Sequence, residues 1–215
     1  MKQLVIIGAG GQGQDVHWAA MNIHARQPSY TFAGFCDDAE TLRSGIYCGL
    51  PLLGSVEAAA AKLQGDVFFI CAVGDNRNRE KLVTRAEQLG WKAETIIDPS
   101  VPIAPGVIIG AGTYVGALAV LSSKARIGRH VLVNQGCSIG HDSVLGDFSQ
   151  VCPGGRISGA AVLGHGAFVG SNGVIAPRIE VGAWARLGAN AFALRPVPAG
   201  STAVGNPAKV VFARH

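Results

Sequence analysis

The chain has little of several features that mark large classes of protein. Charged residues make up only 15% of its 215 positions, and the basic ones form no block, so its net charge of +4 does not indicate a nucleic-acid partner. The five cysteines contain no CxxC pair and are odd in number, which favours free thiols in a reducing compartment. The apolar run before Gly8 covers residues 4–7, too short for a signal peptide or a membrane span. We therefore expect a soluble, cytoplasmic protein.

What the chain has instead is a period of six residues. An aliphatic residue stands at every sixth position over fifteen consecutive repeats: Ile103, Ile109, Val115, Leu121, Ile127, Val133, Ile139, Leu145, Val151, Ile157, Leu163, Val169, Ile175, Val181 and Leu187. The following residue is usually glycine or another small residue, and the residue two positions earlier is small or β-branched. A period of six fits neither a helix nor one long strand, so the chain must turn at each repeat.

This pattern is the hexapeptide repeat of a parallel β-helix. Three short faces per coil make a triangular prism of 18 residues per turn, with the aliphatic residue inside. The small residue beside it is expected to let the backbone round the corner. After Leu187 the pattern decays, and residues 205–209 close the chain. We assign residues 98–215 to this β-helix domain and its closing segment.

Residues 1–97 read differently, as alternating strands and helices. Strands are expected at 3–7, 31–36, 67–73 and 93–97. Helices are expected after the glycine turn at 8–13 through about residue 26, near 56–63, and after residues 74–76 through residue 89. This alternation predicts a small, doubly wound, Rossmann-like α/β domain with a parallel sheet. Its ligand should lie beyond the carboxyl ends of the strands, which carry Gly10, Gly11, Gln12, Asp37, Asp38 and Gly74.

The glycine turn at residues 8–13 matches the G-x-G-x-x-G pattern between a strand and a helix. Glycines let the backbone approach a ligand closely, and the first N–H groups of the helix attract phosphate. One interpretation is NAD binding, with Asp37 or Asp38 on a ribose hydroxyl. The domain is about half a full dinucleotide fold, so a nucleotide-linked ligand fits its length better. The structural alternative is a set of glycines that only shape the turn.

Of the six histidines, one stands out. His141 lies two residues after Ile139, at an outward corner, and Asp142 follows it directly. One coil later the same corner carries Gly159 and Ala160, so a slender ligand can pass the imidazole. Asn134 lies one repeat before this pair. His130 and His165 also lie on repeats and are expected to be solvated. From spacing alone, an exposed ion pair and a catalytic base remain equally open.

Five segments together resemble a known family: residues 8–13, 35–38, 72–76, 139–147 and 205–209. They are similar to the hexapeptide-repeat bacterial acetyltransferases, related to sialic acid O-acetyltransferases, that modify nucleotide-linked 4-amino-4,6-dideoxysugars. The resemblance covers the whole chain. It implies a left-handed β-helix, a homotrimer, acetyl-CoA as co-substrate, no metal and no membrane. Within the family it favours GDP-perosamine as acceptor and a role in O-antigen biosynthesis, although no single residue identifies the sugar.

The resemblance also implies roles for individual residues. His141 would be the general base and Asp142 the group that raises its basicity. The nucleotide-sugar would face Gly10, Gly11, Gln12, Asp37, Asp38, Gly74 and Asn134. Acetyl-CoA would lie along a groove lined by Gln150, Gly159, Ser171, Gly188, Ala189, Asn206 and Lys209. Relatives often carry histidine where this chain has Gln12 and Gln150, so neither residue can take a proton here.

Three other functions remain open at this point. An O-acetyltransferase would use the same base on a sugar or sialic acid hydroxyl. A metal-dependent hydratase of the γ-carbonic anhydrase type would need three histidines that converge between subunits. His141 and His165 are one coil plus one repeat apart, on different faces. A non-catalytic nucleotide-sugar or scaffold protein would not bind acetyl-CoA at all.

Overall fold

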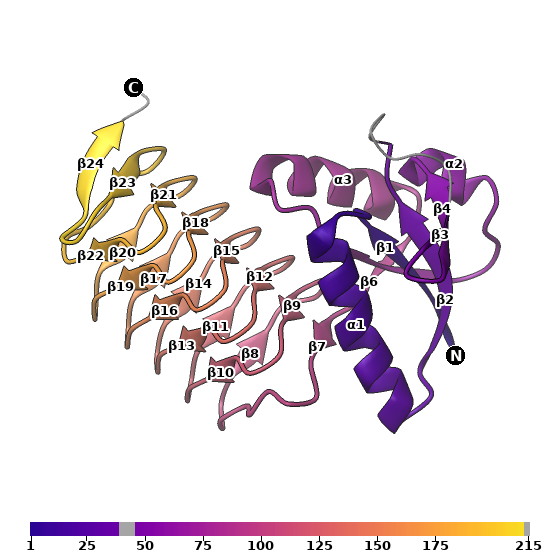
Figure 1. Cartoon of the computed structure of the whole chain (residues 1–215), viewed down its shortest axis with the longest axis horizontal. Helices are drawn as coiled ribbons and strands as arrows, with labels where there is room; N and C mark the ends of the chain where they lie inside the picture. Colours follow the sequence, from indigo (N-terminus) through magenta and orange to yellow (C-terminus); the bar gives the residue numbers. More distant parts are fainter. Residues whose placement is uncertain (39–45, 213–215) are drawn as a thin grey trace. The chain divides into compact units, whose positions relative to one another are not determined.

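The computed structural model describes residues 1–38 and 46–212. The chain divides into two compact units, Met1–Ile96 and Ile97–His215. Within the described part of the chain, no helix is both long and apolar enough to cross a membrane. Figure 1 traces both units along the sequence, from the helices and strands of the first to the stacked short strands of the second. Each unit is described below by itself.

The first unit is built on a six-stranded sheet whose strands are parallel apart from one edge hairpin. The strands follow the order β3 (Ile46–Tyr47), β4 (Leu50–Gly54), β2 (Tyr30–Cys36), β1 (Lys2–Ile7), β5 (Val67–Cys71) and β6 (Lys92–Ala93). Among the described strands of this sheet, only β3 and β4 pair antiparallel. The helices are α1 (Gly11–Arg26), α2 (Val56–Ala60) and α3 (Asn76–Gln88). The carboxyl ends of β1, β2 and β5 therefore meet at one edge of the sheet, as the alternation of elements predicts.

Three details of this unit differ from the sequence interpretation. The strand expected at 93–97 is two pieces, β6 and β7 (Ile96–Ile97), and β7 belongs to a sheet of the second unit. The helix expected near 56–63 ends at Ala60. The hairpin of β3 and β4 was not expected. The segment shows little alternation of apolar and polar residues, because Leu50, Leu52 and Leu53 surround Pro51. Such a segment is more typical of a loop than of a strand.

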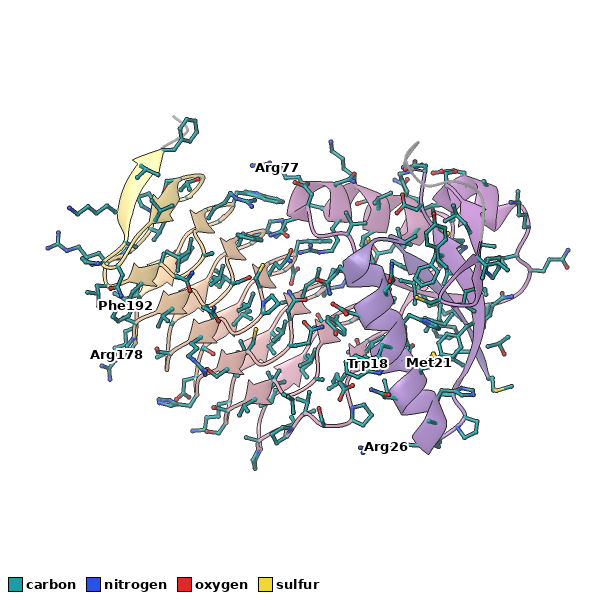
Figure 2. The ribbon with its side chains drawn as sticks, viewed as in Figure 1. Trp18, Met21, Arg26, Arg77, Arg178 and Phe192 are labelled. Carbon is teal, nitrogen blue, oxygen red and sulfur yellow. The ribbon has the colours of Figure 1, made fainter. Side chains whose placement is uncertain are left out.

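The central strand β1 is buried over residues 4–7, as expected for a parallel strand covered on both faces. Phe35 and Phe69 are fully buried on the strands beside it. His17 packs edge-on against Phe32 and Phe35, with ring centroids 5.1 and 5.7 Å apart, and burial lowers its pKa. Trp18 and Met21 of α1, labelled in Figure 2, are about half exposed.

The second unit is a prism of three parallel sheets. One consists of β10 (Val120–Leu121), β13 (Ser138–Ile139), β16 (Arg156–Ile157), β19 (Val174–Ile175) and β22 (Phe192–Ala193). Another consists of β8 (Ile108–Ile109), β11 (Arg126–Ile127), β14 (Val144–Leu145), β17 (Val162–Leu163) and β20 (Glu180–Val181). The third consists of β7, β9 (Tyr114–Val115), β12 (Leu132–Val133), β15 (Gln150–Val151), β18 (Phe168–Val169), β21 (Arg186–Leu187), β23 (Thr202–Val204) and β24 (Lys209–Phe212).

From β8 to β22, each strand pairs with the strand 18 residues away, so successive coils stack in register. The last coil is shorter, because β23 pairs with β21 at a spacing of 16 residues, and β24 pairs antiparallel with β23. The aliphatic residues of the period fill the interior, and those from Val115 to Leu187 are at most 2% exposed. Ile103 is an exception at 49% exposed, because it begins its column and bridges only to Leu121.

The corners of the prism are left-handed turns at a fixed position. Backbone φ is positive at every sixth residue from Gly106 to Asn190, three places after each aliphatic residue. Most of these residues are not glycine, and Figure 2 shows Arg178 projecting outward from one such corner. The small residue after each aliphatic has another role, contrary to the expectation that it turns the chain. A Cβ on Gly140 would lie 2.6 Å from the backbone nitrogen of Gly159, so small residues there let coils stack.

One corner column carries aromatic rings. His130 stacks on Phe148, which contacts His165, and His165 lies edge-on to Trp184, with centroids 5.2, 5.6 and 5.0 Å apart. His130 is only 1% exposed, so the expectation that it is solvated is wrong. Its ring lies against Gly112, where an added Cβ would be 2.2 Å from Nδ1. Stacking of residues 18 positions apart buries this imidazole.

Candidate active site

The pair His141–Asp142 occupies the corner between β13 and β14. Asp142 takes the left-handed conformation of that corner, with φ +58°, which aspartate tolerates better than most residues. Its N–H donates to Ser123 O at 3.1 Å, and His141 O accepts from Ala160 N at 2.8 Å. The coil before and the coil after therefore hold the backbone of the pair. Both side chains are exposed, at 66% for His141 and 52% for Asp142.

The two side chains form a hydrogen bond of 2.8 Å between His141 Nδ1 and Asp142 Oδ2. This bond, more than any other contact, lowers the pKa of Asp142, and Lys124 one coil earlier adds to the shift. An ionised carboxylate accepts the proton on Nδ1 and leaves Nε2 with its lone pair. With Nδ1 engaged by the carboxylate, Nε2 is the ring atom left to act as a proton acceptor.

Gly159 sits one coil above, directly at this acceptor atom. A Cβ built on Gly159 would be 2.5 Å from His141 Nε2 and 2.7 Å from Cε1, closer than real contacts allow. The glycine therefore makes room for the ring. Among the described residues, no hydrogen bond uses the N–H of Gly159. This corner therefore brings together an imidazole, its partner carboxylate and an available backbone N–H.

Two other predicted site residues of the prism are buried. Asn134 is 2% exposed, and its Nδ2 donates to Val151 O at 3.0 Å. Gln150 is 5% exposed, and its Nε2 lies 3.8 Å from the sulfur of Cys152. The side chain of Asn134 is thus hydrogen-bonded to the backbone of the next coil. Their roles toward a ligand stay predictions.

The remaining predicted acetyl-CoA residues lie on the last coils. Ser171 and Ala189 are exposed and stand one coil apart at one corner, and Gly188 precedes Ala189. A Cβ on Gly188 would be 2.9 Å from Cγ1 of Val204 on β23. Asn206 and Lys209 are exposed on the closing hairpin. These residues lie toward the end of the prism opposite β8, with Ser171 fewer than two coils and Ala189 fewer than three coils after His141.

In the first unit, the glycine turn joins β1 to α1. Gly8 has φ +101°, and a Cβ on Gly13 would be 1.9 Å from Gly8 O, so both positions require glycine. Gly10 and Gly11 differ, because a Cβ there would meet nothing within 4 Å. Open space therefore lies beside the turn at Gly10 and Gly11, where the sequence predicts ligand contact.

A cavity of about 170 Å³ adjoins the turn at the carboxyl ends of the strands. It is lined by Ile7, Gly8, Cys36, Asp37, Asp38, Ser55, Val56, Val73, Asn78 and Leu82. Asp37 Oδ2 accepts from Ala9 N at 2.9 Å and so holds the turn, whereas Asp38 is exposed at the cavity. Burial raises the pKa of the Cys36 thiol to about 12, so this lining residue stays a thiol.

Gly74 follows β5 and is exposed, with open space where a Cβ would stand. The buried guanidinium of Arg79 donates to Val73 O at 2.8 Å and so fixes the loop before it. Gly74 itself is not among the cavity-lining residues. The sequence missed Ser55 and Val56, because the strand before them, β4, was not expected. Asn78 and Leu82 were missed because nothing in the sequence shows which face of α3 meets the cavity.

Among the described residues, no three His, Cys, Asp or Glu side chains gather closely enough to hold a metal ion.

Comparison with known proteins finds relatives for both units of the chain. Residues 3–86 match the PglD N-terminal domain family. The acetyltransferase domain of PglB from Neisseria gonorrhoeae, solved with acetyl coenzyme A, superimposes with a TM-score of 0.90 at 31% identity and covers 98% of this chain and 99% of that one. The chain belongs to the hexapeptide-repeat nucleotide-sugar N-acetyltransferases. The predicted fold class of these acetyltransferases, a Rossmann-like sheet followed by a β-helix, is confirmed.

Two other relatives of this chain are named for different sugars. A histidine-to-asparagine variant of perosamine N-acetyltransferase from Caulobacter crescentus, in complex with CoA and GDP-perosamine, matches with a TM-score of 0.89 at 29% identity, covering 99% and 98% of the two chains. UDP-N-acetylbacillosamine N-acetyltransferase of Bacillus subtilis is 34% identical over 122 residues, 54% of this chain. The match spans about half, 52%, of that relative's length.

Proposed function

We propose that this chain transfers the acetyl group of acetyl-CoA to the 4-amino group of a nucleotide-linked 4-amino-4,6-dideoxysugar. GDP-perosamine is the favoured acceptor. The observation that carries the proposal is the corner at which Asp142 orients His141 and Gly159 leaves Nε2 accessible. The relatives supply the chemistry, because they were solved with acetyl coenzyme A or with CoA and GDP-perosamine.

The reaction requires an amine to attack a thioester and to lose a proton as the C–N bond forms. His141 Nε2 carries the lone pair that accepts this proton, while Asp142 stabilises the resulting imidazolium. The tetrahedral intermediate then collapses with cleavage of the C–S bond. The imidazolium returns its proton to the departing CoA thiolate, which restores the base and gives free CoA. A positioned base contributes about 10²–10⁴ in rate.

Negative charge develops on the acetyl oxygen during the attack and needs a donor. The N–H of Gly159 stands at the same corner and makes no hydrogen bond to any residue in the described ranges. We assign it to the oxyanion, where a preorganised donor contributes about 10²–10³ in rate. No acyl-enzyme is needed. Ser143 follows the pair, but it is buried and its hydroxyl donates to Gly140 O at 2.6 Å.

The substrates use the predicted residues of each unit. The nucleotide-sugar contacts the turn at Gly10, Gly11 and Gln12 and the carboxylates beside the cavity, while acetyl-CoA lies along the exposed residues Ser171 and Ala189 toward Asn206 and Lys209. A homotrimer completes the acetyl-CoA groove. The enzyme acts in the cytoplasm, in a pathway of the O-antigen type.

The decisive experiment offers acetyl-CoA with a panel of GDP-, UDP- and dTDP-linked amino sugars and follows the release of free thiol. Turnover should be fastest with GDP-linked 4-amino-4,6-dideoxymannose and absent from its 4-hydroxy counterpart. Turnover of the 4-hydroxy compound alone would identify an O-acetyltransferase instead. Preference for a UDP-linked amino sugar would support the proposed N-acetylation but show that GDP-perosamine is not the acceptor. Absence of acetyl-CoA binding would leave only a non-catalytic role and refute the proposal.

A further inference from the structure

Two helices of the first unit contribute to the lining of the cavity at the carboxyl ends of the strands. Ser55 and Val56, where α2 begins, are lining residues, and so are Asn78 and Leu82 of α3. The cavity of about 170 Å³ is smaller than the sites of about 300–1,000 Å³ that enclose a whole drug-sized ligand. It therefore holds one part of a nucleotide, and a small change in the separation of α2 and α3 changes the fit.

The shorter of the two helices depends on tertiary contacts for its position. α2 spans only five residues, Val56–Ala60, and so short a helix has little stability of its own. Val56 and Ala59 are buried, and Ser55 Oγ caps the helix by accepting from Ala58 N at 3.2 Å. α2 also packs against α3. Contacts between the two helices therefore decide how far apart their cavity residues lie.

A bidentate ion pair joins the two helices beside the cavity. Arg85 Nε donates to Glu57 Oε1 at 2.7 Å, and Arg85 Nη2 donates to Glu57 Oε2. Glu57 directly follows Val56. Arg85 lies one helical turn after Leu82, on the side of α3 that carries Leu82 and Asn78. The planar fork of the guanidinium fixes the geometry of this pair more tightly than that of other exposed ion pairs.

The charges around this pair belong to both helices and to the cavity. The hydrogen bond to Arg85 lowers the pKa of Glu57 to about 2, so this carboxylate is ionised above about pH 4. The same bond raises the pKa of Arg85, and the charge of Asp38 adds to the shift. Because Asp38 lines the cavity, the guanidinium lies close enough to the cavity to interact with its carboxylate.

We propose that Glu57 and Arg85 are a positioning pair, which fixes the separation of α2 and α3 at which the cavity accepts the nucleotide part of the nucleotide-sugar. This rests on the function proposed above. The pair acts through the lining residues Val56 and Leu82 and does not touch the reacting atoms. Because it forms the cavity before the ligand arrives, its loss lowers affinity and leaves the chemical step unchanged.

Calorimetry with GDP and UDP tests the pair. The two side chains are 39% and 50% exposed, so Glu57→Gln or Arg85→Gln should weaken affinity about 2- to 5-fold, as for loss of an exposed ion pair. The double variant should lose no more than either single one, because both changes remove the same contact. KM for the nucleotide-sugar should rise by the same factor, with unchanged kcat and CoA affinity. Glu57→Arg combined with Arg85→Glu should bind more tightly than either reversal alone.

The ion pair of Lys92 and Asp66 is the matched control. It is also exposed and lies in the same unit, and neither residue is among the described residues that line the cavity. Lys92→Gln should leave the affinity for both nucleotides unchanged. A loss of affinity in Arg85→Gln alone would mean that the guanidinium contacts the ligand directly, and would overturn the positioning role. Wild-type affinity in every variant of the pair would assign it to stability and leave the proposed reaction intact. A wild-type protein that binds neither nucleotide would overturn both proposals.

Discussion

The space that a Cβ would occupy on Gly159 is taken by the imidazole of His141, whose Nε2 lies 2.5 Å from that point. Gly159→Ala must therefore displace the ring or cover its acceptor atom. The backbone of Gly159 is outside the left-handed region, so alanine adds no backbone strain. We expect kcat to fall by about 10²-fold or more, with an unchanged melting temperature. Wild-type turnover by this variant would mean that Nε2 does not face the reacting amine.

His141→Asn should remove the base and keep the corner, because asparagine is also a polar residue of modest size. We expect kcat to fall about 10²–10⁴-fold, with CoA binding preserved by calorimetry. His165→Asn is the matched control, since His165 is another partly exposed imidazole of the prism and contacts Phe148 and Trp184. Equal losses in the two variants would argue against a specific base.

The pKa of Asp142 is lowered by its hydrogen bond to His141, and this sets the pH dependence of the pair. A depressed carboxylate pKa keeps the charge present above the ordinary value, and the charge is lost only as pH falls through the lowered one. Asp142 thus stays ionised above about pH 5, so the loss of its charge does not limit the rate there. Asp142→Asn should reduce kcat about 10- to 100-fold at every pH. A variant that differs from wild type only below pH 5 would contradict this role.

His17 predicts an acid weakness of the first unit. Burial between Phe32 and Phe35 lowers its pKa below the ordinary 6.5, so the unfolded chain binds this proton more readily. Stability should therefore be full above pH 6.5 and decline as pH falls below it. In His17→Gln, the loss of melting temperature between pH 7 and pH 5 should be roughly 2–4 °C smaller than in wild type. An identical loss in both proteins would assign the acid weakness to other groups.

Adjacent residues of β10 test the prism interior. Leu121 is 1% exposed, whereas Val120 is 44% exposed. Leu121→Ala leaves a cavity inside stacked coils and should cost about 2–5 kcal/mol of unfolding free energy, measured with urea. Val120→Ala removes exposed methyl groups and should change it by less than about 0.5 kcal/mol. Similar costs at both positions would contradict the inside–outside alternation.

Much of the fold follows from local pattern. The run from Ile103 to Leu187 predicts the prism because each buried aliphatic repeats at a fixed spacing that no other structure satisfies. Prediction from local pattern was wrong where the segments were short. The segment at 93–97 looks like one strand, yet it splits into β6 and β7, since two residues suffice for a strand on a β-helix. His130 reads as a surface histidine because periodicity does not reveal which corner residues stack.

The sequence by itself determined the period, the interior and the two candidate sites, because each depends on residue type at a regular spacing. It also put His141 beside Asp142 and Gly159 one coil later. Only the tertiary structure decided that His141 Nε2 meets the Gly159 corner and that Asp37 holds Ala9. These relationships join atoms of different coils or strands. Such contacts depend on the register of stacking and on side-chain rotamers, which no local pattern of residues specifies.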